Sequence, residues 1–207
     1  MGRSKRGRDS LRRTPGRKRL AKRIYLICEG HTEKNVVDQM RQMYRLRGVK
    51  IITITQGEGP KKVVKRAQDE KRKNRFDKDD EFWVAFDRDQ HEGWDEALEQ
   101  ARRDGFHLAV SNPCVELWGI LLYEDQFAHL KRTTAQKRLS ELHKTYDHSK
   151  NPYISLDHVP GLDSALGEAD TRAETLLERV RQRGEERGNP TTRFHEFIRA
   201  LRDGAAR

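Results

Sequence analysis

The chain has 207 residues, of which 34% are hydrophobic and 37% are charged. That length suits one domain with extensions or two small domains, and the low apolar content requires a compact core. The longest apolar run, Trp118–Tyr123, has six residues, whereas a membrane-spanning helix needs roughly 20. The basic N-terminus is not followed by an apolar stretch, so it does not resemble a secretory signal. The two lone cysteines, Cys28 and Cys114, predict reduced thiols and a cytoplasmic location.

The net charge of +10 comes from the N-terminal segment 1–23. This segment holds eleven Lys and Arg residues and one acid, whereas the rest of the chain has 32 basic and 32 acidic residues. A like-charged block with few large apolar residues is expected to be disordered. It favours polyanions, above all nucleic acid, through salt-dependent contacts; a solubilising tail without a partner is an equally weighted alternative. The candidate nucleic-acid-binding residues are Arg12, Arg13, Arg17, Lys18, Arg19 and Lys22.

Residues 24–123 alternate between apolar β-forming runs and helical patterns. Strands are predicted over Ile24–Cys28, Val49–Thr55, Phe82–Phe86 and Phe106–Val110. Helices are predicted to begin near Thr32, Pro60, Trp94 and Val115. Thr32 is expected to cap the first of these helices. Strands that alternate with helices predict an α/β domain with a parallel sheet and right-handed crossovers.

Residues 124–207 are mostly helical in pattern and highly charged. Helices are predicted near 132–146, 163–183 and 192–202, with a loop over 147–160. Because this half has too little apolar content for an independent core, we expect a helical extension that packs on the α/β domain. The predicted organisation is therefore a disordered basic tail over 1–23, an α/β domain over 24–123 and a helical extension over 124–207.

Acidic residues follow two of the predicted strands at the point where each strand ends. Glu29 comes after the first strand, and Asp87 and Asp89 come after the third. Open parallel sheets bind ligands at the carboxyl ends of their strands, and residues at i and i+2 of an extended segment point the same way. Converging carboxylates repel one another, so one of them should have a raised pKa without a cation. Oxygen ligands without clustered Cys or His favour Mg²⁺ or Mn²⁺.

Two further acids, Glu33 and Glu116, fall in the first turns of predicted helices. Acids stabilise helix N-termini, so capping is the stronger interpretation for both, and Glu33 is kept as an additional metal ligand. For the acids that end the strands, a metal site is favoured over solvated loops because their charges converge. A response-regulator-like pocket is an alternative, but it would need a lysine after a later strand, and none follows the fourth strand.

Four short motifs carry a family resemblance. Cys28–Glu33 (CEGHTE) followed by Phe86–Asp89 (FDRD) resembles the Toprim signature, a Glu after the first strand and a DxD after a later one. Ser111–Trp118 (SNPCVELW) and Gly188–Phe197 (GNPTTRFHEF) are similar to motifs of the RloB-like family. Proteins of that family resemble Toprim nucleases and are often encoded at phage-defence or abortive-infection loci, commonly beside an ATPase. The resemblance extends over residues 24–201.

The resemblance implies a Toprim-like Rossmannoid sheet and Mg²⁺-dependent chemistry on nucleic-acid phosphates. By analogy Glu29 would be the catalytic glutamate, a general acid/base or a metal ligand. Asp87 and Asp89 would hold Mg²⁺. Asn112 and Glu116 would order the site.

The last motif contains His195 and Glu196 inside a helical pattern. One interpretation is that they dock this helix near the acidic edge; an ordinary core-facing helix with polar neighbours is at least as good an interpretation. The turn Asn189-Pro190 with Thr191 or Thr192 is expected to form a turn and a helix cap.

Two functions of different classes follow from these patterns. The first is a Mg²⁺-dependent Toprim-type nuclease that cleaves DNA or RNA phosphodiesters by in-line attack of water, in defence against phage. The second is a non-catalytic module that binds nucleic acid or a partner ATPase, with structural acids; a ligase or primase-like partner subunit is a third interpretation. The complete acidic set favours the enzyme, and the sequence does not distinguish a DNA from an RNA substrate.

Overall fold

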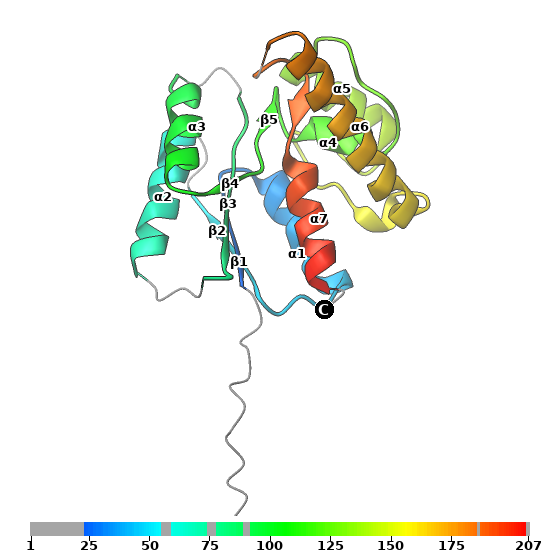
Figure 1. Cartoon of the computed structure of the whole chain (residues 1–207). Helices are drawn as coiled ribbons and strands as arrows, with labels where there is room; N and C mark the ends of the chain where they lie inside the picture. The colour runs from blue at the N-terminus through cyan, green and yellow to red at the C-terminus, as the bar shows by residue number, and fades with distance from the viewer. Residues whose placement is uncertain (1–22, 55–58, 74–77, 89–91, 186, 206–207) are drawn as a thin grey trace, which may run out of the picture.

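The computed structural model describes residues 23–54, 59–73, 78–88, 92–185 and 187–205. A four-stranded parallel sheet lies at its centre, in the order β2-β1-β3-β4 (Figure 1). The strands are β1 (Ile24–Cys28), β2 (Val49–Thr53), β3 (Glu81–Ala85) and β4 (His107–Leu108). The predicted α/β class with a parallel sheet is confirmed.

The central strand β1 is buried along its whole length, as expected of a strand covered on both faces. Its last residue, Cys28, lies opposite Thr53 of β2 and Ala85 of β3. The fourth strand is shorter than predicted, because regular pairing stops at Leu108 and resumes as a single parallel bridge between Asp87 and Ser111. This bridge extends the β3 edge of the sheet by one residue pair beyond Phe86.

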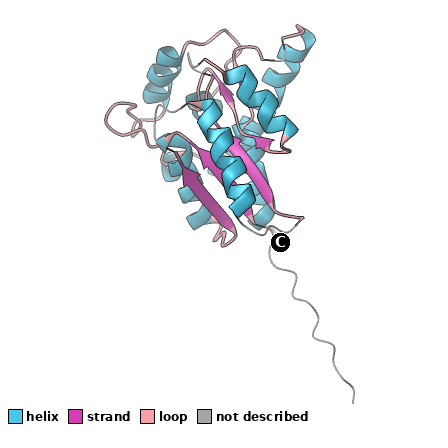
Figure 2. Ribbon diagram, turned by 90° about the vertical axis from the view of Figure 1, so that its left-hand side faces the viewer, coloured by secondary structure: helices cyan, strands magenta, loops and turns pink. Residues whose placement is uncertain are grey.

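Helices cover both faces of the sheet (Figures 1 and 2). On one face lie α2 (Pro60–Lys73) and α3 (Trp94–Arg103), which pack against the side chains of Tyr25 and Ile27. On the other face lie α1 (His31–Met43) and α7 (Phe194–Ala205), which pack against Leu26 and Cys28. The alternation of β1 side chains thus assigns each residue to one of two apolar layers.

The first helix does not begin as predicted. It starts at His31, and its N-cap is Gly30, a residue that makes no side-chain cap hydrogen bond. Thr32 lies inside the first turn and is buried, so the expectation that Thr32 caps this helix is wrong. The strand ends at Cys28 and the helix begins at His31, so only Glu29 and Gly30 connect them and the N-cap position falls on Gly30.

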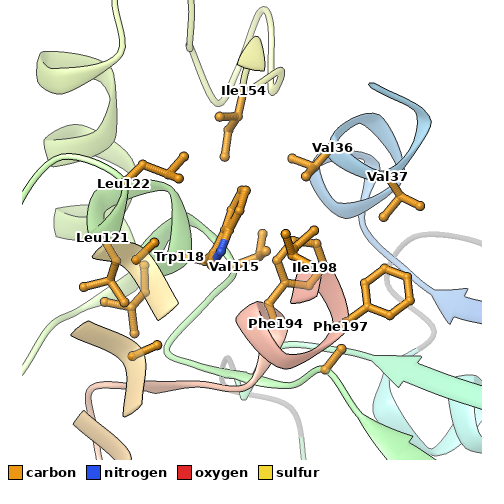
Figure 3. Close-up of a cluster of buried hydrophobic side chains, with 14 of the residues drawn as sticks. Val36, Val37, Val115, Trp118, Leu121, Leu122, Ile154, Phe194, Phe197 and Ile198 are labelled. Carbon is orange, nitrogen blue, oxygen red and sulfur yellow. The ribbon is translucent and has the colours of Figure 1, made fainter. Parts of the chain in front are cut away.

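The predicted α/β segment ends with α4 (Glu116–Leu121). The C-terminal half then contributes α5 (Arg132–Leu142), a 3₁₀ turn (Leu156–His158) and α6 (Leu162–Gln182). Its apolar side chains belong to the same buried cluster as the α1 and α7 face of the sheet. In this cluster Trp118 makes an edge contact with Phe194, and the ring centroids lie 5.2 Å apart (Figure 3). Within the described residues no helix has both the length and the apolar character needed to cross a bilayer.

A two-stranded antiparallel ladder joins segments far apart in the sequence. It pairs β5 (Ser111–Asn112) with β6 (Thr191–Thr192), and the Ser111 and Thr192 hydroxyls lie 2.8 Å apart. The sequence predicted a turn and a helix cap here. The cap is confirmed, since Thr192 Oγ1 accepts a hydrogen bond from the Phe194 N–H, but the ladder was not predicted.

Candidate functional site

Two predicted site residues lie at the carboxyl edge of neighbouring strands. Glu29 follows β1 directly, and Asp87 lies two residues after β3. Because Cys28 and Ala85 are partners in the parallel ladder, the two acids leave the sheet at the same edge. Asp87 is held there by its bridge to Ser111, whose carbonyl accepts the Arg88 N–H at 2.8 Å. Both acids are half-buried, so this edge opens to solvent.

Glu33 is a buried acid in the first turn of α1. Its carboxylate lies against the backbone of Gly30, where a Cβ atom would come within 1.8 Å of Glu33 Oε2. The pKa of Glu33 is raised to about 7, chiefly by burial and also by the charges of Glu116 and Glu29, which together outweigh the lowering effects of its own backbone N–H and of Arg132. Of the acids at this edge, Glu33 is therefore one that can hold or release a proton near neutral pH.

Glu116 begins α4 and is also buried, but its charge is satisfied. The Tyr146 hydroxyl donates a hydrogen bond to Glu116 Oε1 at 2.6 Å, and His148 Nδ1 lies 3.5 Å from the same oxygen. Burial by itself would raise the pKa of Glu116. Hydrogen bonds from His148, Tyr146, Cys114 and its own backbone N–H outweigh burial and lower this pKa below its usual value.

Three of the described acids are linked through their effect on the pKa of Glu33, and Asp87 is linked to them through a buried thiol. Glu116 and Glu29 raise the pKa of Glu33, and Glu116 and Asp87 add to the effect of burial in raising the pKa of Cys114. Charges that perturb the same groups lie in one electrostatic neighbourhood. We call Glu29, Glu33, Asp87 and Glu116 the acidic cluster.

The capping interpretation of Glu33 and Glu116 also finds support in the structure. Each carboxylate bonds to its own backbone N–H in the first turn of a helix, where acids are favoured. Unlike ordinary caps, both side chains are buried: only 4% of Glu33 and 3% of Glu116 is exposed. A cap at a helix end needs no burial, so these two acids combine a capping contact with a place in the acidic cluster.

Other predicted site residues do not join the acidic cluster. Asn112 is buried and donates hydrogen bonds to the carbonyls of Arg187 and Gly188, both at 3.0 Å. Its amide therefore anchors the segment that leads into β6. His195 is fully buried in α7 and contacts the Thr192 carbonyl, and Glu196 pairs with Arg193. In the described part of the chain neither His195 nor Glu196 makes a hydrogen bond or ion pair with the cluster, which leaves the core-facing helix as their better interpretation.

Asp89 and the tail residues Arg12, Arg13, Arg17, Lys18, Arg19 and Lys22 lie outside the described residues. Their predicted roles stay predictions. The second carboxylate of the DxD motif is thus not placed relative to the cluster.

The ligand chemistry of the acidic cluster fits Mg²⁺ or Mn²⁺. It consists of carboxylate oxygens, and burial raises the pKa of both neighbouring thiols, Cys28 and Cys114, well above the usual value. Protonated thiols are poor ligands, which disfavours the soft metals. Among the described residues no three acids, histidines or cysteines form a ready ligand group. Mg²⁺ does not require one, because it keeps several waters and commonly uses one or two carboxylates together with substrate phosphates.

Three residues of the cluster's surroundings were not predicted from the sequence. Tyr146 and His148 bond Glu116, and Arg132, in the first turn of α5, lowers the pKa of Glu33 by its positive charge. Tyr146 is buried. No local signal marks these residues, since they reach the cluster through the packing of the C-terminal half.

No curated protein and no solved structure matches the chain significantly. A family model described as "RloB-like protein" matches residues 24–201, which contain the sheet, the acidic cluster and the β5–β6 ladder. The chain belongs to the RloB-like protein family.

Proposed function

We propose that this protein is a Mg²⁺- or Mn²⁺-dependent nuclease of Toprim type that cleaves nucleic-acid phosphodiesters. The observation that carries the proposal is the convergence of the acidic cluster at the carboxyl edge of a parallel sheet, where open α/β sheets bind their ligands. Family membership supports it, because RloB-like proteins resemble Toprim nucleases.

The proposal assigns a role to each group at the edge. Asp87 and Glu29, with Asp89, would hold the metal, which supplies positive charge to the phosphate during in-line displacement. Glu29 is half-buried and open to solvent, so its carboxylate can accept the proton of the attacking water. Glu116 stays ionised through its hydrogen bonds, and its charge favours the protonated form of the neighbouring Glu33.

Cleavage of nucleic acid with and without divalent metal tests the proposal. The full chain is incubated with plasmid DNA and with transfer RNA in EDTA, Mg²⁺ or Mn²⁺. We expect metal-dependent cleavage of at least one substrate by the wild type and by the control Glu178→Gln, which alters an exposed acid of α6. Asp87→Asn should be folded and inactive. Undiminished cleavage by folded Asp87→Asn, or binding of both substrates with no cleavage in either metal, would support the non-catalytic module instead.

We further propose that the nuclease acts in the cytoplasm in anti-phage defence, together with an ATPase. The support is the genomic setting typical of RloB-like proteins, and the presence of two free, buried thiols agrees with a reducing compartment. Phage plating on cells that express the chain alone and together with a candidate ATPase tests this role. Equal plating with wild type and Asp87→Asn would remove the link between cleavage and defence.

A further inference from the structure

One helix of the sheet domain carries a strongly basic exposed face. In α2 the exposed cations are Lys61, Lys62, Lys65, Arg66, Lys71, Arg72 and Lys73. At 100° per residue, six of these residues fall within an arc of about 140° on the side opposite the buried Val63 and Ala67, and only Lys71 lies outside it. Asp69 is the one acid inside this arc. We call these six cations the α2 basic face.

The charge pattern of this face opposes the stability of the helix itself. Lys61 and Lys65, and Lys62 and Arg66, are like-charged neighbours four residues apart, which destabilise an isolated helix. The first turn of α2 contains no acid, so Lys61 and Lys62 face the positive end of the helix dipole. An anion along this face would remove both sources of repulsion.

Much of this charge has no counter-ion in the protein. Within the described residues Lys62, Lys65, Arg72 and Lys73 form no ion pair and no hydrogen bond through their side chains, whereas Arg66 pairs with Glu70 at 2.9 Å. The neighbouring helix α3 differs, since its exposed side chains include Asp95, Glu96 and Glu99 besides two arginines. The positive excess on this side of the sheet therefore belongs to α2 and not to α3.

The α2 basic face begins at the edge that carries the acidic cluster. α2 starts after β2, so its N-terminus lies at the carboxyl edge of the sheet (Figure 1). The stem of Lys61 lies against Gly93, where a Cβ atom would come within 2.2 Å of Lys61 Cε, and its Nζ is 3.9 Å from Glu96. Gly93 ends the loop that leaves Asp87, so Lys61 reaches the connection that follows this acid.

We infer that the α2 basic face binds the phosphate backbone of the nucleic acid and leads it to the acidic cluster. The inference rests on the proposed nuclease function. A helix of 14 residues is about 21 Å long, which corresponds to about six phosphates along one strand of a duplex. The contacts are to phosphates, so the face gives affinity and orientation and does not read bases.

Three neutral substitutions on the full chain test this surface. The variant Lys62→Gln/Lys65→Gln/Arg72→Gln removes three exposed charges and keeps residues of good helix propensity. The control Lys137→Gln/Arg181→Gln/Arg183→Gln removes three exposed charges from α5 and from the end of α6. Both variants have the same net charge, so a difference between them reports the position of the charges. Binding is measured in EDTA by fluorescence anisotropy with a duplex DNA, a single-stranded DNA and an RNA hairpin over a series of salt concentrations.

The α2 variant should bind at least one probe about tenfold more weakly, and its slope of log K against log salt should shrink by about 2 to 3. The control should keep the wild-type slope, and the probe with the largest difference identifies the nucleic acid. Equal slopes for the two variants on every probe, or no binding of any probe by the wild type, overturn the inference. Cleavage is assayed separately with metal. If the wild type binds through α2 but never cleaves, the proposed nuclease function is wrong and the binding surface stands. If the wild type cleaves while both variants bind alike, only the inference about the α2 basic face is wrong.

Discussion

At the scale of single residues, Glu116 shows how a buried charge is kept in place. Tyr146 and His148 come from a loop of the C-terminal half, and together with Cys114 they hold the carboxylate in its ionised form. Removing one hydrogen-bond donor from a buried carboxylate costs more free energy of unfolding than losing an average hydrogen bond. The reason is that the buried oxygen then has neither a protein donor nor water to replace it.

Tyr146→Phe should therefore lower the free energy of unfolding at neutral pH by about 1 to 3 kcal/mol. Since the pKa of Glu116 lies below its usual value of 4.5, the stability from this carboxylate is present above the unfolded pKa and is lost as the pH falls through the folded pKa. The difference between wild type and variant should accordingly shrink in acid. Urea melts at neutral and acidic pH measure it. The control is Tyr153→Phe, because this half-buried tyrosine makes no hydroxyl hydrogen bond with a described residue. An equal loss of unfolding free energy in both variants would mean that the effect comes from losing a tyrosine hydroxyl in general and not from the bond to Glu116.

Glu29→Gln should separate charge from shape in the acidic cluster. Glu29 contributes to the raised pKa of Glu33, so its neutralisation relieves repulsion and should slightly raise the melting temperature without metal. Millimolar-range Mg²⁺ should raise the melting temperature of the wild type by mass action and that of the variant by less. Cleavage by the variant should fall by roughly 100-fold or more. Equal Mg²⁺-induced shifts with full activity in both proteins would make Glu29 a turn residue without a role in chemistry.

At the scale of elements, the turn from β1 to α1 depends on a missing side chain. Gly30 has φ −81° and ψ 144°, a conformation open to any residue, so its backbone does not require glycine. The space above it is occupied by the Glu33 carboxylate. The constraint on residue 30 is therefore the position of Glu33.

Gly30→Ala should lower the free energy of unfolding by about 1 to 3 kcal/mol, because overpacking forces the Glu33 carboxylate to move. In a Glu33→Ala background the same substitution should cost almost nothing, since the obstructing atoms are gone. A double-mutant cycle by denaturant melts measures this coupling, and Gly167→Ala, where the added Cβ meets nothing within 4 Å, controls for the effect of alanine alone. Additive costs of the two substitutions would contradict the contact.

Helix α7 contains a histidine that is held neutral. His195 is fully buried, its Nδ1 lies 3.1 Å from the Thr192 carbonyl, and its Nε2 has no hydrogen-bond partner among the described residues. Nδ1–H is then the donor. The pKa of His195 is lowered to about 4, chiefly by burial and also by the charges of Arg199 and Arg193, which together outweigh the raising effects of Glu174 and the Thr192 carbonyl.

Because the folded pKa of His195 lies below the unfolded value of 6.5, the unfolded chain binds the proton first as the pH falls. As the pH falls from about 6.5 to about 4, His195 therefore lowers the free energy of unfolding by about 3 kcal/mol in total. In His195→Asn the amide can still donate to Thr192, and that loss should be absent. Thermal or urea melts across this pH range give the slope of the unfolding free energy against pH for His195→Asn. This slope is compared with the slopes of the wild type and of the control His129→Asn, which removes an exposed histidine. A His195→Asn slope that matches the wild type would refute the buried neutral histidine.

At the scale of the whole molecule, one apolar cluster links the two halves of the chain. It runs from Ile24 in the first strand to Leu201 in the last helix, and it includes side chains from α1, α4, α5, α6 and α7. Tyr146 and His148, which bond Glu116, come from this C-terminal half, so the acidic cluster is completed only when both halves are folded together.

Deletion of residues 1–22 should change affinity and not chemistry. If the six predicted contacts of the tail neutralise phosphates, the slope of log K against log salt should shrink by up to about 5. Turnover at saturating substrate should persist, because the acidic cluster lies wholly within residues 24–201. Anisotropy titrations over a salt series and cleavage at high substrate concentration measure the two quantities, and an unchanged slope would show that the tail contacts no phosphate.

The sequence by itself determined the sheet class, the order of strands and helices along the chain, and the pair Glu29 and Asp87 at one edge. Apolar runs and helical periodicity are local properties, and parallel pairing then follows from the alternation of strands with helices. Errors fell where a local signal competed with geometry: the cap of α1 at Gly30 instead of Thr32, and the short β4 followed by a single bridge at Ser111.

Only the tertiary structure decided which acids and donors are neighbours. Tyr146 meets Glu116 across 30 positions, and Ser111 meets Thr192 across 81, so no pattern within one element reveals either contact. The same holds for the raised pKa of Glu33, which arises from burial beneath the packed halves and from the charges of Glu116 and Glu29. Hydrogen bonding and desolvation depend on distance in space, and distance in space is set by the packing of the whole chain.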